Sequence, residues 1–133
     1  MQVKIDTKER FEVITLEEPI LSANIAAELT QLCNSYSNRE VKNVVLKLPS
    51  LTTIEDDAAE ELGRLQQCFY ENNASFVICE LPAGIEQRLD ELELLETMNV
   101  TKTESEAWDI VQMEEIEREL MDDDDVEFNK QEE

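Results

Sequence analysis

The sequence predicts a single α/β domain with a mixed, largely parallel sheet of about 4–5 strands and about 4 helices, followed by a disordered acidic C-terminal tail. Three observations lead to this prediction. Short apolar runs rich in β-branched residues alternate with longer amphipathic stretches, the 133 residues suit one hydrophobic core, and the last residues are almost wholly polar. We therefore expect the domain to occupy residues 1–121 and the tail to occupy residues 122–133.

Four segments carry the main strand signals. Residues 44–48 and 76–79 are apolar, too short for helices, and without clean alternation of apolar and polar residues. Such runs are typical of central strands that are covered on both faces of the sheet. Residues 3–5 and 11–16 alternate better and flank the polar turn 6–10, so we expect them to pair, with one strand near a sheet edge.

Amphipathic stretches between and after these strands are expected to form the helices. The first begins near 22–24, the second spans 56–70, the third starts just after 82–84, and the fourth starts with a Ser/Thr-x-x-Glu capping box at 103–106. The first helix is marked by apolar residues at steps of three or four positions: Ile25, Leu29, Leu32, Cys33 and Tyr36. With a short strand near 99–102, the order β-β-α-β-α-β-α-β-α implies right-handed crossovers.

The last helix has the least regular apolar stripe. Its candidate core positions are, in order, Ala107, Ile110 or Val111, and Met113 or Glu114. Trp108 lies beside this stripe and is expected to pack at the edge of the core, the alternative being an exposed docking aromatic. Apolar residues continue through Ile116 to Leu120, beyond what one small sheet covers, which would let the helix pack on another subunit.

The charge of the chain limits the classes of partner that it can bind. Eleven basic against 33 acidic residues give a formal charge of −22, which argues against binding to nucleic acid or to an anionic membrane. No apolar run approaches the roughly 20 residues of a membrane span, and the first residues do not resemble a secretory signal, so a cytoplasmic location is expected. The last twenty residues alone carry 11 acids and two bases, a charge of −9.

Cysteine and histidine usage limits the chemistry further. Cys33, Cys68 and Cys79 are odd in number and widely spaced, and the chain has no histidine. We expect buried free thiols, no disulfide framework, and neither metal nor cofactor. Without histidine, the commonest general base near neutral pH is missing.

The most unusual segment follows the predicted strand 44–48. It carries Thr53 as a plausible helix cap and then Glu55, Asp56 and Asp57 in the first helical turn. Open α/β sheets place functional sites where strands end and helices begin, although the helix dipole alone also stabilises acids there by about 0.3–1 kcal/mol each. An enzyme pairing Asp56 or Asp57 with Glu80 or Glu55 as acid and base is disfavoured, because no apolar pocket is indicated around them.

At these residues the chain resembles the STAS family, the domain of bacterial anti-sigma-factor antagonists. Residues 51–58, Leu-Thr-Thr-Ile-Glu-Asp-Asp-Ala, look like a degenerate copy of the family stretch Leu-Ser-x-hydrophobic-Asp-Ser-Ser-Gly. The strand 76–79, the helix with Ile85 and Leu89, the following Leu94 and Leu95, and residues 103–108 also fit the family order. The resemblance spans most of residues 1–118.

The resemblance implies a regulatory interaction domain without enzymatic activity, taking part in partner switching and transcription regulation. In that family the second serine is phosphorylated by a partner that is both kinase and anti-sigma factor. Asp57 stands at that position here, so the resemblance implies a domain that is not switchable there. The expected partner interface is Thr53, Glu55, Asp56, Asp57 and Ala58.

Two interpretations of Asp57 remain open: it imitates the phosphorylated state, or it belongs to a repurposed interface for a basic protein. The repurposed interface is favoured because the whole surface is acidic. The alternative function is acidic docking, or polyanion mimicry, by the C-terminal tail on a basic partner. The sequence leaves the partner's identity and the oligomeric state open.

Overall fold

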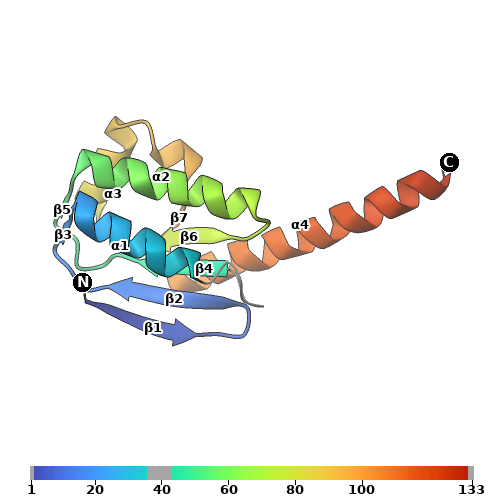
Figure 1. Ribbon diagram of the computed structural model, residues 1–133, viewed down its shortest axis with the longest axis horizontal. Helices are drawn as coiled ribbons and strands as arrows, with labels where there is room; N and C mark the ends of the chain where they lie inside the picture. The colour runs from blue at the N-terminus through green and yellow to red at the C-terminus, as the bar shows by residue number, and fades with distance from the viewer. Residues whose placement is uncertain (1, 36–42, 132–133) are drawn as a thin grey trace.

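The computed structural model describes residues 2–35 and 43–131, with side chains as far as residue 120. Its main sheet has the strand order β1-β2-β4-β6-β7 (Figure 1). These strands are β1 (Val3–Thr7), β2 (Phe11–Leu16), β4 (Asn43–Lys47), β6 (Phe76–Cys79) and β7 (Asn99–Thr101). Only β1 runs antiparallel to its neighbour, so the sheet is mixed and largely parallel, as predicted.

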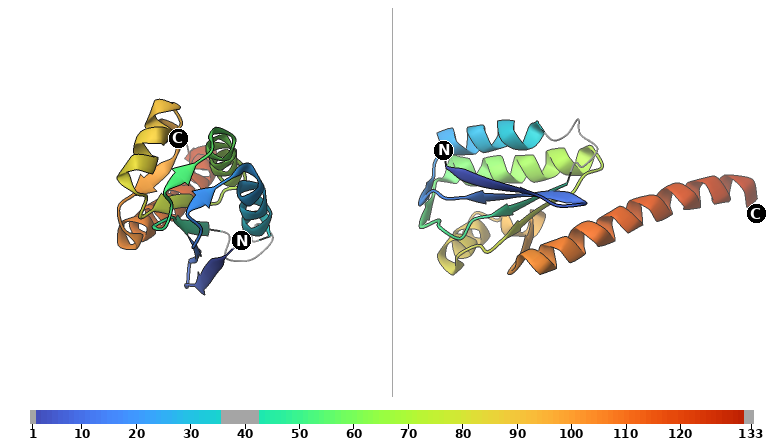
Figure 2. Two further views of the ribbon diagram at one scale, coloured as in Figure 1. Left: turned by 90° about the vertical axis from the view of Figure 1, so that its left-hand side faces the viewer. Right: turned by 90° about the horizontal axis from the view of Figure 1, so that it is seen from below.

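Helices cover both faces of this sheet, as Figure 2 shows in its right-hand view. Helices α1 (Ala23–Asn34) and α2 (Asp56–Glu71) lie on one face, and α4 (Glu104–Gln131) lies on the other. Helix α3 (Ala83–Glu91) adds Ile85 and Leu89 to the core that α1 and α2 share. A short 3-10 helix, η1 (Leu95–Thr97), leads into β7.

The central strands have an apolar residue at almost every position because each face has its own core. Val44 and Leu46 of β4 belong to the core beneath α1 and α2, whereas Val45 belongs to the core beneath α4. Successive side chains of a strand point to opposite faces, so burial on both faces requires apolar residues at odd and even positions alike. This explains the missing alternation in the sequence.

Most predicted elements are confirmed to within a residue or two. The strand expected at 44–48 begins and ends one residue earlier, the strand 76–79 is unchanged, and the helix expected at 56–70 ends at Glu71. The predicted turn 6–10 is shorter, because β1 continues to Thr7. Tyr36, expected on the first helix, lies outside the described residues.

A second, two-stranded parallel sheet was not predicted. Strand β3 (Ile20–Leu21) pairs with β5 (Thr53–Ile54), and Ile54 and Leu21 are buried in the larger core. Thr53 is therefore part of β5 and not the cap of α2, which corrects the sequence interpretation. Two-residue strands carry no periodicity by which a sequence could reveal them.

Helix α4 begins at the predicted capping box, although the glutamate accepts from the residue before the cap and not from the cap itself. Thr103 Oγ1 accepts a hydrogen bond from the amide of Glu106 (3.2 Å), and the Glu106 carboxylate accepts one from the amide of Lys102 (3.0 Å). Of the candidate core positions, Ala107 and Val111 are buried and Glu114 is half-buried, whereas Met113 and Trp108 are exposed.

The sequence predicts no regular structure after residue 121, but the backbone continues as α4 to Gln131 and projects from the body (Figure 1). A helix that is already nucleated by its packed part extends at little cost, since each further residue adds one hydrogen bond. The division of the chain at residue 121 stays a prediction. No described helix carries an apolar stretch of the length that a bilayer crossing requires.

Candidate functional site

The candidate site is the loop between β4 and α2, at the edge where the parallel strands of the main sheet end. The second sheet fixes this loop in place. The amides of Thr52 and Thr53 both donate to the Pro19 carbonyl (2.7 and 3.1 Å), and the amide of Glu55 donates to the Leu21 carbonyl (3.0 Å). Because Leu51 is also buried, the loop is anchored on both its backbone and its apolar side chains.

Glu55 connects the first turns of two helices. It is the N-cap residue of α2, but its side chain makes no capping hydrogen bond to that helix. Instead its carboxylate accepts a hydrogen bond from the amide of Ala23 (3.0 Å), the first residue of α1. A carboxylate is favourable there, because the first amides of a helix lack partners within the helix and carry partial positive charge.

Asp56 connects α2 to α3. Its carboxylate accepts a hydrogen bond from Arg88 Nη2 (2.7 Å), and Arg88 also donates to Glu91 (3.2 Å). The hydrogen bond to Asp56, together with the one to Glu91, raises the pKa of Arg88. Both partners are about half exposed, so this ion pair positions the two helices more than it stabilises the fold.

Asp57 is the acid of this group whose carboxylate makes no hydrogen bond or close ion pair within the described part of the chain, although its charge acts at longer range on Arg64, further along α2. It is exposed and lies in the first turn of α2, where the helix dipole favours negative charge. Thr53 is an exposed residue of the same loop, whereas Ala58 is fully buried in the core. Of the predicted interface residues, Ala58 therefore offers a partner no side-chain surface.

Acid–base chemistry by two carboxylates needs unlike environments, with one of the two groups buried in an apolar pocket. None of the four carboxylates considered for this role is buried. Glu55, Asp56 and Asp57 are all exposed, and Glu80 forms an ion pair with Lys47 (3.2 Å). Lys47 also binds Glu104 (3.2 Å), so Glu80 belongs to a link between β4 and α4. In the described part of the chain, no three His, Cys, Asp or Glu side chains converge as metal ligands would.

Two cysteines lie in the core, and the third is half-buried. Burial raises the pKa of Cys33 to about 12, and burial is also the main reason that the pKa of Cys79 rises to about 12. Cys68 is half-buried on α2. All three are free thiols, so the prediction of free and mostly buried cysteines is confirmed.

Sequence reasoning missed the residues that engage Glu55 and Asp56. Arg88 is separated from Asp56 by 32 positions, as Ala23 is from Glu55, and no spacing rule connects residues so far apart. The only sequence signal was that Arg88 is a lone base among acids on α3.

Comparison with known proteins places this geometry in a family. The model of the STAS domain matches residues 2–107. No curated protein sequence matches the chain closely enough to count as a relative. Several solved structures share the fold at low sequence identity.

Three of these structures show the extent of the likeness. An anti-sigma factor antagonist from Mycobacterium paratuberculosis is 12% identical with a TM-score of 0.70, covering 84% of this chain and 93% of that one. A serine-to-glutamate variant of RsbS from Moorella thermoacetica is 17% identical with a TM-score of 0.70, covering 84% and 96%. SpoIIAA in its unphosphorylated form is 16% identical with a TM-score of 0.63, again covering 84% and 96%.

The family match confirms the predicted resemblance to the STAS family, and the solved structures confirm the fold predicted with it. Since the family model covers residues 2–107 of 133, the chain belongs to the STAS domain family.

Proposed function

We propose that this chain is a regulatory interaction domain of the anti-sigma-factor-antagonist type, without enzymatic activity, that binds a protein partner through the first turn of α2. The observation that carries the proposal is the unequal use of three neighbouring acids. Glu55 and Asp56 are engaged by hydrogen bonds within the protein, whereas Asp57 is exposed and makes no hydrogen bond or close ion pair with a described residue.

The two engaged acids make the third a rigid recognition point. Glu55 fixes the start of α2 to α1, and Asp56 fixes it to α3. Asp57 therefore projects from a backbone that three helices hold in place, so a partner would spend little free energy on ordering it. Thr53 of β5 is exposed on the same loop and offers a neutral hydroxyl.

Asp57 supplies a permanent charge at this point. A phosphoserine carries about −1.5 to −2 charges at pH 7, whereas a carboxylate carries one and forms no stable phosphate ester under a serine switch. We favour an interface repurposed for a basic partner over a domain locked in an inactive state, since the chain carries −22. The partner is an anti-sigma factor, a kinase-like protein or another basic protein, and the complex forms in the cytoplasm.

The experiment begins with crosslinking and pull-down from the native cell, followed by titration of the purified partner against four chains. We expect Asp57→Lys to weaken binding by about tenfold or more, as for a central charged contact. Glu96→Lys makes the same charge change at an exposed position of η1, just before β7, and should bind like the wild type. Unchanged binding by Asp57→Lys would refute the proposed interface.

The fourth chain, Asp57→Ser, tests the fixed charge. With ATP and a kinase-type partner it should accept phosphate, whereas the wild type should not accept it at this position. Phosphorylation of the wild type on Thr53 or Thr52 would show that the switch has moved to a neighbouring hydroxyl, contrary to the proposal.

The second candidate function assigns partner binding to the acidic end of α4. The observation in its favour is that this end of the helix leaves the body while the last twenty residues carry a charge of −9 (Figure 1). Removing residues 122–133 should then abolish partner binding at low salt. Persistence of binding would exclude this function.

A further inference from the structure

A second candidate surface lies on α4, on the side turned away from the sheet. Met113, Ile116 and Leu120 are 59%, 55% and 54% exposed. Their spacing of three and then four residues places them on one face of the helix. We call these three side chains the outer stripe.

The opposite side of α4 is fixed to the sheet, so the helix cannot turn to bury the outer stripe. Ala107 and Val111 are fully buried against the strands. Two polar anchors add to them: the Glu104 carboxylate accepts from Lys47 (3.2 Å), and that of Glu114 accepts from Asn99 (3.0 Å).

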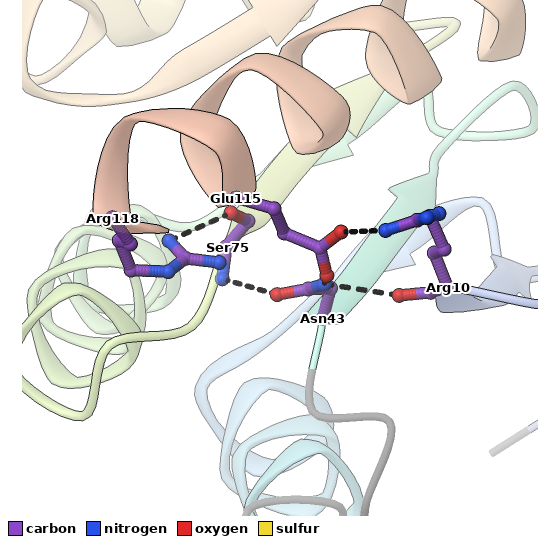
Figure 3. Close-up of polar contacts among 5 residues, drawn as sticks. All are labelled: Arg10, Asn43, Ser75, Glu115 and Arg118. Carbon is purple, nitrogen blue, oxygen red and sulfur yellow. Dashed lines mark hydrogen bonds and ion pairs between the residues drawn. The ribbon is translucent and has the colours of Figure 1, made fainter. Parts of the chain in front are cut away.

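A third anchor lies where the helix leaves the body (Figure 3). The Glu115 carboxylate accepts from Asn43 Nδ2 and from Arg10 Nη1, both at 2.7 Å. One turn on, Arg118 donates to the Ser75 hydroxyl (3.4 Å). We call these five residues the Asn43 cluster. Since it holds the Glu115 side of α4 inward, Met113, Ile116 and Leu120 face outward.

The outer stripe has acidic neighbours. Asp109, Glu117 and Glu119 are exposed and make no hydrogen bond or close ion pair with a described residue, and of the three only Glu119 acts by its charge on Arg10 in the described part of the chain. The sequence then continues with four aspartates at 122–125. An apolar line between unpaired acids is complementary to a helix that carries its own apolar line between lysines or arginines.

A shallow groove extends this surface towards α2. It is lined by Tyr70, Glu71 and Asn73 of the α2 end and by Glu114, Glu117 and Arg118 of α4. Tyr70 is 73% exposed. An exposed aromatic ring among carboxylates suits a cationic side chain, which gains both ion pairing and a cation–π contact. Glu117 lines the groove and also flanks the outer stripe, so the two features adjoin on α4.

From these observations we infer that the outer stripe of α4, with the Tyr70 groove beside it, is a docking surface for a basic amphipathic helix of a partner protein. A second copy of this chain is a poor occupant, because it brings the same charge of −22 and the same acidic flanks. This surface is separate from Asp57, which lies at the other end of α2, where the parallel strands end.

The test uses the full chain and a fluorescent peptide of about 18 residues, made of leucine and lysine in amphipathic helical order, with a scrambled peptide of the same composition. Binding is measured by anisotropy at two salt concentrations. The test variant is Ile116→Ser/Leu120→Ser. Its matched control is Ile5→Ser/Ile20→Ser, which removes two isoleucines that are 45% and 48% exposed elsewhere.

We expect the wild type to prefer the ordered peptide by about tenfold or more, and the test variant to lose that preference while the control keeps it. Asp57→Lys should also keep it, which separates this surface from the proposed α2 interface. The inference would be overturned if the wild type bound both peptides equally, or if the test variant kept the preference for the ordered peptide. It would also be overturned if Asp57→Lys abolished that preference. A wild-type dimer in sedimentation that the test variant dissociates would overturn it as well, because a second copy would then cover the stripe.

Discussion

Replacing Asn43 by alanine should destabilise the protein far more than its place at the start of a strand suggests. Asn43 is only 4% exposed and makes three hydrogen bonds with its side chain. Its Nδ2 donates to the Arg10 carbonyl (2.9 Å) and to Glu115 (2.7 Å), while its Oδ1 accepts from the Ser75 amide (2.8 Å). It therefore joins the start of β4 to α4 and to the residues that immediately precede β2 and β6.

The size of the effect follows from what Asn43→Ala leaves behind. The amide of Ser75, a residue only 1% exposed, loses its acceptor, and the Arg10 carbonyl loses a donor. Glu115 retains its ion pair with Arg10 and so stays partly compensated. A buried polar group without a partner costs about 1–3 kcal/mol, and with the partly accessible Arg10 carbonyl we expect a total loss of about 2–4 kcal/mol.

Urea denaturation at pH 7, followed by far-UV circular dichroism, measures this loss. With an m-value of about 2 kcal/mol per molar urea, the midpoint should fall by about 1–2 M with m unchanged. The matched control is Asn99→Ala, which removes a single side-chain hydrogen bond to Glu114 at a half-buried position and should cost about 1 kcal/mol. If Asn43→Ala costs no more than Asn99→Ala, the Asn43 cluster does not anchor α4 as described.

Three further predictions concern other parts of the molecule. Burial alone lowers the pKa of Lys47, but its hydrogen bonds to Glu104 and Glu80 outweigh burial and raise the pKa. Because the pKa of Lys47 is higher in the folded state, its protonation stabilises the protein below the unfolded-state pKa of about 10.4, and this stabilisation is lost as the pH rises above that value. Unfolding curves at alkaline pH should therefore show the loss in the wild type but not in Lys47→Met. Thiol titration at pH 8 should detect one fast cysteine, Cys68, with Cys33 and Cys79 reacting only on unfolding, because burial raises the pKa of both to about 12. Removing residues 122–133 should leave the urea midpoint unchanged, since that end of α4 projects away from the body; a lower midpoint would show that it packs on the domain.

The fold was predictable because its main elements carry strong local patterns. The strand 76–79 is apolar at every position and is bounded by polar or turn residues, so both its type and its ends were evident. Pairing of β3 with β5 was not predictable, because it depends on hydrogen bonds from Thr52 and Thr53 to Pro19, more than thirty residues away. For this reason the sequence predicts Thr53 as the cap of α2, whereas the residue belongs to β5.

The place of the three acids in the chain was predictable, but which of them form hydrogen bonds within the protein was not. The sequence placed Glu55, Asp56 and Asp57 in the first turn of a helix, and this is confirmed for Asp56 and Asp57, whereas Glu55 is the N-cap residue. Which of them is free depends on Ala23 and Arg88, whose places are set by the packing of α1 and α3 against α2. The same limit applies to α4, where the choice between Met113 and Glu114 as the inward residue was decided by Asn99, which binds Glu114.

The negative charge of this chain and its exposed apolar side chains together favour a partner that is basic and has an apolar contact surface. The charge of −22 keeps copies of the chain apart, so apolar side chains such as Ile116 and Leu120 can stay exposed without driving self-association. The same charge attracts a basic protein from a distance, and attraction through solvent weakens as salt rises. Once contact is made, the apolar groups add an attraction that salt does not weaken. The two contributions should therefore separate experimentally: the loss of affinity caused by Asp57→Lys should shrink as salt rises, whereas the loss caused by changes at the outer stripe should be the same at low and high salt.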